Sequence, residues 1–142
     1  MKIISFAWTT EALLTGHKTV TRRDWKENHA TSFHEGDLIA AYDRLPIQGG
    51  RKVATLKLTK RPYLERYSAA PDSDFENEGL AWMQERYEET RLRDYTLNGL
   101  SPRQFWMAQK LGDALVYVVR FELLHAFYDG RGNIIPWQKD QP

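Results

Sequence analysis

The run of residues 114–124 restricts the fold of this chain more than any other segment. It reads Ala-Leu-Val-Tyr-Val-Val-Arg-Phe-Glu-Leu-Leu and is rich in the β-branched and aromatic residues that favour strands. We therefore expect a long strand that runs through the core. Apolar or alternating patterns predict further strands at residues 3–7, 19–23, 38–42 and 54–59. The pair Gly49-Gly50 between the last two indicates a hairpin.

Residues 101–112 carry the clearest helical pattern. Ser101 can cap the helix, Pro102 suits its first turn, and Gly112 suits its end. The spacing of the apolar residues predicts a buried face formed by Phe105, Trp106, Ala108 and Leu111.

A second helix is predicted over residues 74–90, where Ser73 and Glu76 have the spacing of a capping box. Gly79 lies inside this pattern, and glycine disfavours a helix interior by about 1 kcal/mol relative to Ala. We expect the helix to break there or the backbone to bend. Strands with helices inserted in so short a chain predict an α+β fold, a small mixed β-barrel with two or three helices, rather than a doubly wound parallel sheet.

The composition predicts one domain over residues 1–142, with a core over about 1–125 and a C-terminal extension over about 126–142. The chain is 42% hydrophobic, which is ample for one packed core, and it has no Cys, which excludes disulfides and thiolate metal sites. No run approaches the roughly 18 apolar residues of a membrane helix, and the apolar start is too short for a signal peptide. We expect a cytoplasmic protein that does not bind membranes, and its oligomeric state stays open.

Charge is unevenly distributed along the chain, although the net charge is only +1. Residues 17–66 contain 11 Lys and Arg against 6 Asp and Glu, whereas residues 67–100 contain 3 against 8. A basic segment can form a surface that attracts nucleic acid or nucleotides. The alternative is that the two segments pair with each other or face water.

Residues 16–23, Gly-His-Lys-Thr-Val-Thr-Arg-Arg, place cations and hydroxyls where a short helix over residues 9–15 meets a strand. Gly16 suits the left-handed position after a helix, so Lys18 falls on the turn. In the strand, Thr21 and Arg23 share one face while Val20 and Arg22 share the other. Of these residues, only Val20 is expected in the core. An exposed basic edge that keeps the strand soluble is the alternative interpretation of the cations.

Four segments together resemble the ASCH family (activating signal cointegrator homology), whose barrel is PUA-like and related to RNA-binding domains. They are Gly16-x-Lys18-x-x-x-x-Arg23, Phe33-x-x-Gly36-Asp37 before an apolar strand, Glu78-Gly79-Leu80, and the strand over residues 116–124. Their order and spacing cover most of the first 124 residues. The resemblance implies a PUA-like barrel and RNA or nucleoside binding.

Thr21 stands where the family motif usually has an acidic residue. The run Lys-Thr-x-Thr is similar to the bacterial ASCH branch that hydrolyses N4-acetylcytidine with a Thr nucleophile, a Lys and a Glu. By position, the resemblance implies Lys18, Thr21 and Glu78 as catalytic residues, with no cofactor. This chain departs from that branch at Arg22, where an apolar residue is usual, and in the added helix over residues 101–112.

Amide hydrolysis by a Thr hydroxyl requires a base, donors for the oxyanion and an acid for the leaving amine. A free Lys has a pKa of about 10.4, so Lys18 needs a depression of roughly three units to act as a base near pH 7. Burial and a neighbouring Arg lower this pKa, whereas an ionised Glu78 raises it. If Glu78 prevails, Lys18 stays charged and Glu78 must accept the proton.

Two aromatic residues are candidates for stacking a base beside these cations. Trp8 precedes the first helix and Tyr42 ends a strand, and we predict them with Arg22 and Arg23 as substrate-binding residues. Ordinary core packing is the alternative for Trp8, as it is for Thr21, and a solvated helix acid is the alternative for Glu78. The four histidines, His17, His29, His34 and His125, lack metal-ligand spacing, so no metal is predicted.

Three functions follow as hypotheses. The first is a protein that binds a nucleoside or single-stranded RNA, with acylcytidine amidohydrolase activity as its most specific form. The second is a noncatalytic RNA-binding module, and the third is a ribonuclease that acts on single-stranded RNA, in which Lys18 and the arginines stabilise a charged phosphorane. Steep salt dependence would indicate contacts with several phosphates and thus RNA rather than a nucleoside.

Overall fold

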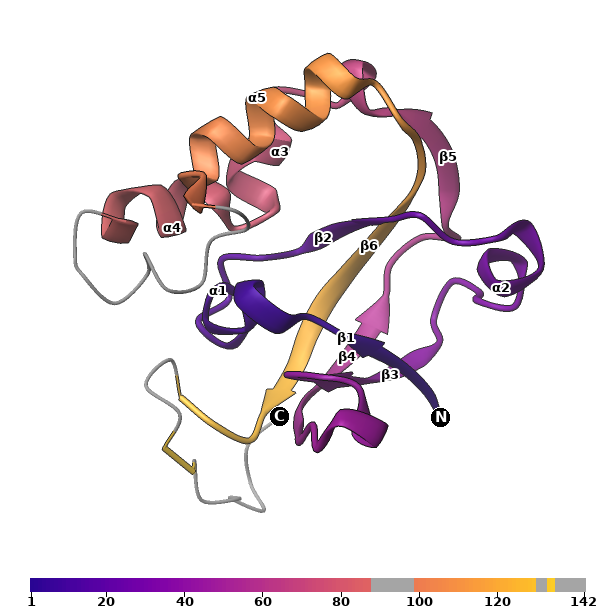
Figure 1. Cartoon of the computed structure of the whole chain (residues 1–142). Coiled ribbons are helices and arrows are strands. Elements are labelled where there is room, and N and C mark those ends of the chain that lie inside the picture. The colour runs from indigo at the N-terminus through magenta and orange to yellow at the C-terminus, as the bar shows by residue number, and fades with distance from the viewer. Residues whose placement is uncertain (88–98, 130–132, 135–142) are drawn as a thin grey trace.

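The computed structural model describes residues 1–87, 99–129 and 133–134 (Figure 1). The six strands there are β1 (Lys2–Ser5), β2 (Val20–Arg23), β3 (Leu38–Tyr42), β4 (Lys52–Leu58), β5 (Tyr63–Arg66) and β6 (Leu115–Ala126). The α-helices are α1 (Thr10–Leu14), α2 (Glu27–Thr31), α3 (Ser73–Asn77), α4 (Leu80–Tyr87) and α5 (Pro102–Gly112). Short 3-10 turns are η1 (Ala7–Thr9), η2 (Pro46–Gln48) and η3 (Tyr67–Ala69).

The strands form one curled, mixed sheet in the order β1-β3-β4-β6-β2, with β5 also paired to β6. Only the β1–β3 pair is parallel. The long strand β6 joins two regions, because residues 115–120 pair with β5 and β2 while residues 121–126 pair with β4. The α+β class is confirmed, and the curled sheet is compatible with the expected small barrel.

Two apolar clusters lie on the two parts of this sheet. The first packs strand residues such as Ile39, Leu56 and Val119 around Phe33. The second packs Val116 of β6 against α4, α5 and η3, with Met83 and Trp106 as members. Figure 1 shows α3, α4 and α5 gathered at the end of the molecule where β6 begins. The helices and the start of β6 therefore enclose a separate region beside β2.

The predicted strand over residues 38–42 and the hairpin around Gly49-Gly50 are confirmed, since β3 and β4 are adjacent and antiparallel. The predicted long strand and the α5 helix are also confirmed. Ser101 accepts a hydrogen bond from the Gln104 backbone N–H in a capping box. Leu111 is 84% exposed, so its predicted burial is wrong. Only the first half of α5 packs on the aromatic rings of the second cluster, through Phe105 and Trp106.

The structure differs from the sequence-based predictions at three further places. The polar segment over residues 24–35, for which no element was predicted, contains α2, which packs through Ala30. The strand β5 was not predicted, because four residues of which two are charged show no clear alternation of apolar and polar side chains. Its pairing with β6 stabilises it. The capping box at Ser73 does not form, because Asp72 is the residue that precedes α3.

Gly79 breaks the helix predicted over residues 74–90, and the structure gives the reason. Its φ is +83°, a left-handed conformation that favours glycine. A Cβ at this position would lie 2.6 Å from Ala12 Cβ and 3.2 Å from Lys18 Cβ. The break thus lets the α3–α4 junction approach the start of β2 closely. The end of the predicted helix, residues 88–90, lies outside the described residues.

Candidate functional site

Lys18 is placed by the chain reversal after α1. Gly16 adopts a φ of +81°, and the backbone N–H groups of His17 and Lys18 both donate to Ala12 O. The chain then runs beside the α3–α4 junction, where Lys18 and Glu78 form an antiparallel bridge and Thr19 N donates to Asn77 O at 2.7 Å. Backbone pairing therefore brings together two residues that are far apart in sequence.

The side chains of Lys18 and Glu78 form a buried ion pair. Lys18 Nζ donates to Glu78 Oε1 at 2.8 Å and to the Glu78 carbonyl at 3.1 Å, and the two residues are only 3% and 5% exposed. Burial lowers the pKa of Lys18 from its ordinary value, although the charge and hydrogen bond of Glu78 oppose this. The shift is in the direction that makes Lys18 a better base near neutral pH.

Thr21 is also almost fully buried, at 4% exposed. Its Oγ1 accepts a hydrogen bond from Arg23 Nε at 3.1 Å, and Arg23 also donates to the Ser5 carbonyl at 2.6 Å. The Arg23 guanidinium lies 5.3 Å from the centre of the Phe6 ring. Burial lowers the pKa of Arg23, with Glu78 opposing the effect. A cation thus lies directly beside the Thr21 hydroxyl.

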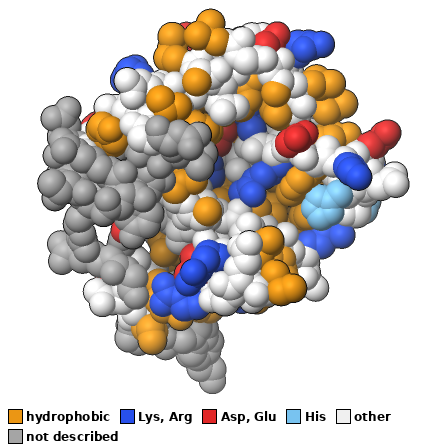
Figure 2. Space-filling view, viewed as in Figure 1, with side chains coloured by type: hydrophobic (Ala, Val, Ile, Leu, Met, Phe, Trp, Pro, Cys, Tyr) orange, Lys and Arg blue, Asp and Glu red, His pale blue; other side chains and the backbone are white. Residues whose placement is uncertain are grey.

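Lys18, Thr21 and Glu78 line one pocket of about 250 Å³ between β2, η1 and α5. Apolar and aromatic groups form the rest of the wall together with Arg22 and Arg23. They include Phe6, Trp8, Tyr67, Leu80 and Phe105. Trp8 meets Phe105 edge to face at a ring distance of 5.0 Å. Figure 2 shows Lys and Arg side chains next to hydrophobic ones around the hollowed middle of this face.

Of the predicted site residues, Tyr42 alone is not among those that line this pocket. It lies at the end of β3, where it is opposite Ser5 in the parallel pair and its carbonyl accepts from Phe6 N at 2.8 Å. Tyr42 therefore supports the backbone that leads into the pocket through its carbonyl, and it is not part of the pocket lining. Trp8, Arg22 and Arg23 do line the pocket.

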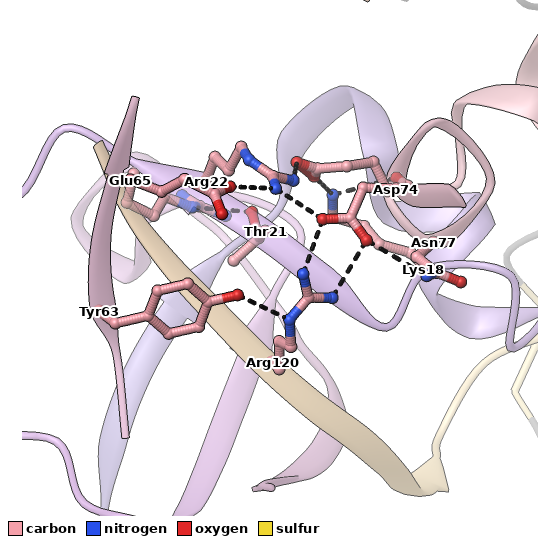
Figure 3. A network of polar contacts seen from close by, with 10 residues as sticks. Lys18, Thr21, Arg22, Tyr63, Glu65, Asp74, Asn77 and Arg120 are labelled. Atoms are coloured by element: carbon pink, nitrogen blue, oxygen red, sulfur yellow. Dashed lines mark hydrogen bonds and ion pairs between the residues drawn. The ribbon is translucent and has the colours of Figure 1, made fainter. Parts of the chain in front are cut away.

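Arg22 is the centre of an ion network behind the pocket wall, and its side chain is only 1% exposed. Its guanidinium contacts three carboxylates, Glu78 Oε2 at 3.2 Å, Glu65 Oε1 at 2.9 Å and Asp74 Oδ2 at 2.6 Å. The Asp74 carboxylate lies between Arg22 and Arg120, whose nitrogens reach it at 3.1 and 2.8 Å (Figure 3). Arg120 also donates to the Tyr63 hydroxyl at 3.0 Å.

Burial and the neighbouring charges shift the pKa values of several groups in this network. Burial alone would lower the pKa of Arg22 and raise that of Asp74. Hydrogen bonds reverse both effects: those to Asp74 and Glu65 raise the pKa of Arg22, and those from Arg120 and Arg22 lower the pKa of Asp74. Burial also raises the pKa of Tyr67, whose ring lies 5.5 Å from the Arg22 guanidinium. Arg22 and Asp74 therefore stay ionised in the interior.

The sequence did not identify Glu65, Asp74, Tyr67 or Arg120 as part of the site. Arg120 gave one usable signal, because it interrupts an apolar run in a strand expected to be buried. Asp74 resembled an ordinary acid in the first turn of a helix. The expectation that only Val20 of the β2 segment is in the core is wrong, since the acidic α3–α4 junction covers Lys18, Thr21 and Arg22. At this site, the basic and acidic segments pair with each other.

Within residues 1–87, 99–129 and 133–134, no group of three or more His, Cys, Asp or Glu side chains is arranged to hold a metal ion. No helix in those ranges is long and apolar enough to cross a membrane. Comparisons with protein-family models, with curated proteins and with solved structures returned no match.

Proposed function

We propose that this chain is an ASCH-like protein with a PUA-like barrel that binds an acylated nucleoside and hydrolyses its amide, with N4-acetylcytidine as the substrate. One observation carries the proposal: Lys18, Thr21 and Glu78 line the same pocket although Glu78 is far from the others in sequence. A buried amine, a hydroxyl and a carboxylate are the groups that nucleophilic amide hydrolysis requires.

The proposed reaction proceeds through an ester on Thr21. Neutral Lys18 takes the hydroxyl proton as Thr21 Oγ1 attacks the acetyl carbonyl carbon. The bond from that carbon to N4 breaks, and the proton passes from Lys18 to the departing amine of cytidine. Water then hydrolyses the ester, which releases acetate and restores the hydroxyl.

The neighbours of these groups support their roles. Burial shifts the pKa of Lys18 downward, which increases the neutral fraction that can accept a proton. Arg23 donates to Thr21 Oγ1, so its positive charge lies next to the attacking oxygen and would stabilise the negative charge of the tetrahedral intermediate. Glu78 holds the Lys18 amine through Oε1.

The pocket suits a small, flat ligand. Its volume of about 250 Å³ matches one base with an acyl group better than an oligonucleotide. Trp8 and Phe105 offer aromatic surface on which a base can stack. The substrate would thus be held by stacking while its amide faces the polar groups of β2.

RNA binding without catalysis is the second candidate function. The polar partners of Arg23 are a hydroxyl and a carbonyl rather than a carboxylate, so this cation can attract a phosphate. Binding of a single-stranded oligonucleotide that weakens steeply with salt, without deacetylation of any acylated nucleoside, would support this function instead.

The deciding experiment compares Thr21→Val with Thr21→Ser in release of cytidine from N4-acetylcytidine, followed by chromatography. Val preserves the shape of Thr without the hydroxyl, whereas Ser retains a nucleophile. We expect Thr21→Val to lose at least about 100-fold in kcat and Thr21→Ser to retain measurable turnover. Unchanged turnover in Thr21→Val would refute the nucleophile. Phosphodiester cleavage that survives Thr21→Ala but not Lys18→Ala would indicate a ribonuclease.

A further inference from the structure

Both oxygens of the Glu78 carboxylate are occupied by cations from β2 and the turn before it. Oε1 accepts from Lys18 Nζ at 2.8 Å, and Oε2 accepts from Arg22 at 3.2 Å. A carboxylate that accepts charge-assisted hydrogen bonds on both oxygens is held in a single orientation. Arg22, the second cation, therefore fixes the orientation in which the Glu78 carboxylate meets the Lys18 amine.

Arg22 is itself held in place by two other elements. Glu65 on β5 and Asp74 on α3 both accept from its terminal nitrogen, and Arg120 on β6 holds Asp74 from the other side (Figure 3). The guanidinium also lies over the Tyr67 ring. These contacts hold the guanidinium through Nη2 and thereby orient Nη1, the nitrogen that reaches Glu78.

One feature distinguishes Arg22 from an arginine that only stabilises the fold. Its Nε is buried and has no hydrogen-bond partner. Leaving a buried donor unpaired is unfavourable, and buried ion clusters are often replaceable by apolar residues without loss of stability. The site retains a charge here at the expense of stability, which points to a role in the pocket.

We propose that Arg22 is a positioning residue that fixes the orientation of the Glu78 carboxylate, so that Glu78 orients Lys18 and Lys18 rather than Glu78 takes the proton of Thr21. This inference rests on the proposed function for its role in the reaction. Glu78 holds the Lys18 amine in place. The positive charge of Arg22 offsets the effect of the Glu78 charge on the pKa of Lys18.

The charged groups that face Lys18 are Glu78 at the α3–α4 junction and Arg22 and Arg23 on β2. Glu78 raises the pKa of Lys18, whereas both arginines lower it. Removal of Arg22 consequently leaves Glu78 less opposed, and the pKa of Lys18 should rise. A purely structural arginine would change stability without this effect on the amine.

The test measures the ionisation of Lys18 directly, by NMR of protein labelled with ¹³C at lysine Cε and titrated with pH. Lys18→Met identifies the signal. In Arg22→Met we expect the Lys18 midpoint to rise by at least about one pH unit, because two charges less than about 10 Å apart at an effective dielectric constant near 20 interact by more than the equivalent free energy. Arg22→Lys keeps a charge and should return the midpoint towards that of the wild type.

Arg120→Met is the matched control, because Arg120 contacts Asp74 but is not among the charges that act on Lys18. It should leave the Lys18 midpoint within about 0.3 pH unit of the wild type, although it weakens the same network. An unchanged midpoint in Arg22→Met, or an equal shift in Arg120→Met, would overturn the proposal. If Arg22→Met does not fold, the Lys18 midpoint in Arg22→Lys decides. This variant keeps the positive charge, so a rise of one unit in it would show that the charge at residue 22 does not set the pKa of Lys18.

The titration does not depend on turnover, so it separates this proposal from the proposed function. Where deacetylation is measurable, Arg22→Met should lower kcat about 10-fold with little change in KM and move the alkaline rise of kcat to higher pH. The predicted NMR shift without any deacetylation would refute the enzyme and retain the positioning role. Deacetylation without the NMR shift would do the reverse.

Discussion

The two halves of β6 lie against two different kinds of interior. Residues 121–126 pair with β4 beside a cluster in which Phe33, Ile39 and Leu56 are fully buried. Residues 115–120 pair with β2 and β5, where Arg120 joins the ion network of Arg22 and Asp74. The first half is stabilised by apolar burial, whereas the second combines apolar packing, as at Val116, with buried charges that must stay paired. The difference predicts that substitutions in the two halves change stability for different physical reasons.

The largest expected effect on stability follows from removing Asp74, which is 1% exposed and joins Arg22 to Arg120. We expect Asp74→Ala to lower the free energy of unfolding by about 3–5 kcal/mol, because two arginines lose a buried partner. Urea denaturation measures this value.

Asp72→Ala is the control for that variant. Asp72 also lies at the start of α3, but its carboxylate is exposed and its partner Lys110 is 3.7 Å away. It should cause little or no change. Equal effects of the two variants would contradict the special role of the network.

A smaller effect concerns the pH dependence of stability. The hydrogen bonds of Arg120 and Arg22 hold the pKa of Asp74 below its ordinary value of 3.8, although burial opposes them. A lowered pKa in the folded state contributes stability at pH values above 3.8, and this contribution is lost as pH falls through the folded-state value. The free energy of unfolding should therefore decrease on acidification below about pH 4, and less steeply in Asp74→Asn.

Leu56→Ala, in the apolar half, provides the comparison for this pH series. We expect it to lower stability by about 2–5 kcal/mol at every pH and to keep the wild-type slope. Asp43 and Asp113 also have lowered pKa values, so some slope should remain in Asp74→Asn. An identical slope in wild type and Asp74→Asn would show that the network does not govern acid stability.

The sequence predicted the elements that bury an apolar face better than it predicted the buried charges. Period and composition sufficed for β3, β4, β6 and α5, since each buries a face that its own residues define. Glu65 and Asp74 became part of the site only through tertiary pairing, and no local pattern encodes which carboxylate meets which arginine. Four-residue β5 likewise depends on its partner β6.

For the site itself, resemblance and residue chemistry selected Lys18, Thr21 and Glu78, and the structure places all three at one pocket. Gly79 was the informative clue, because a glycine inside a helical pattern predicted a break or a bend, and the structure shows that this glycine allows a close approach to Lys18. Tyr42, in contrast, was selected from its position at the end of a strand, and it does not line the pocket. Such a position gives no information about which side of the sheet holds the pocket.

A crystal structure of Thr21→Val with N4-acetylcytidine tests the central claim most directly, because this variant should bind the substrate without cleaving it. We predict the base against Trp8 and Phe105, with the acetyl carbonyl carbon near the Val side chain and about 3–4 Å from where the Thr21 hydroxyl would lie. Substrate bound outside this pocket, or with its acetyl group directed away from residue 21 and Lys18, would contradict the account.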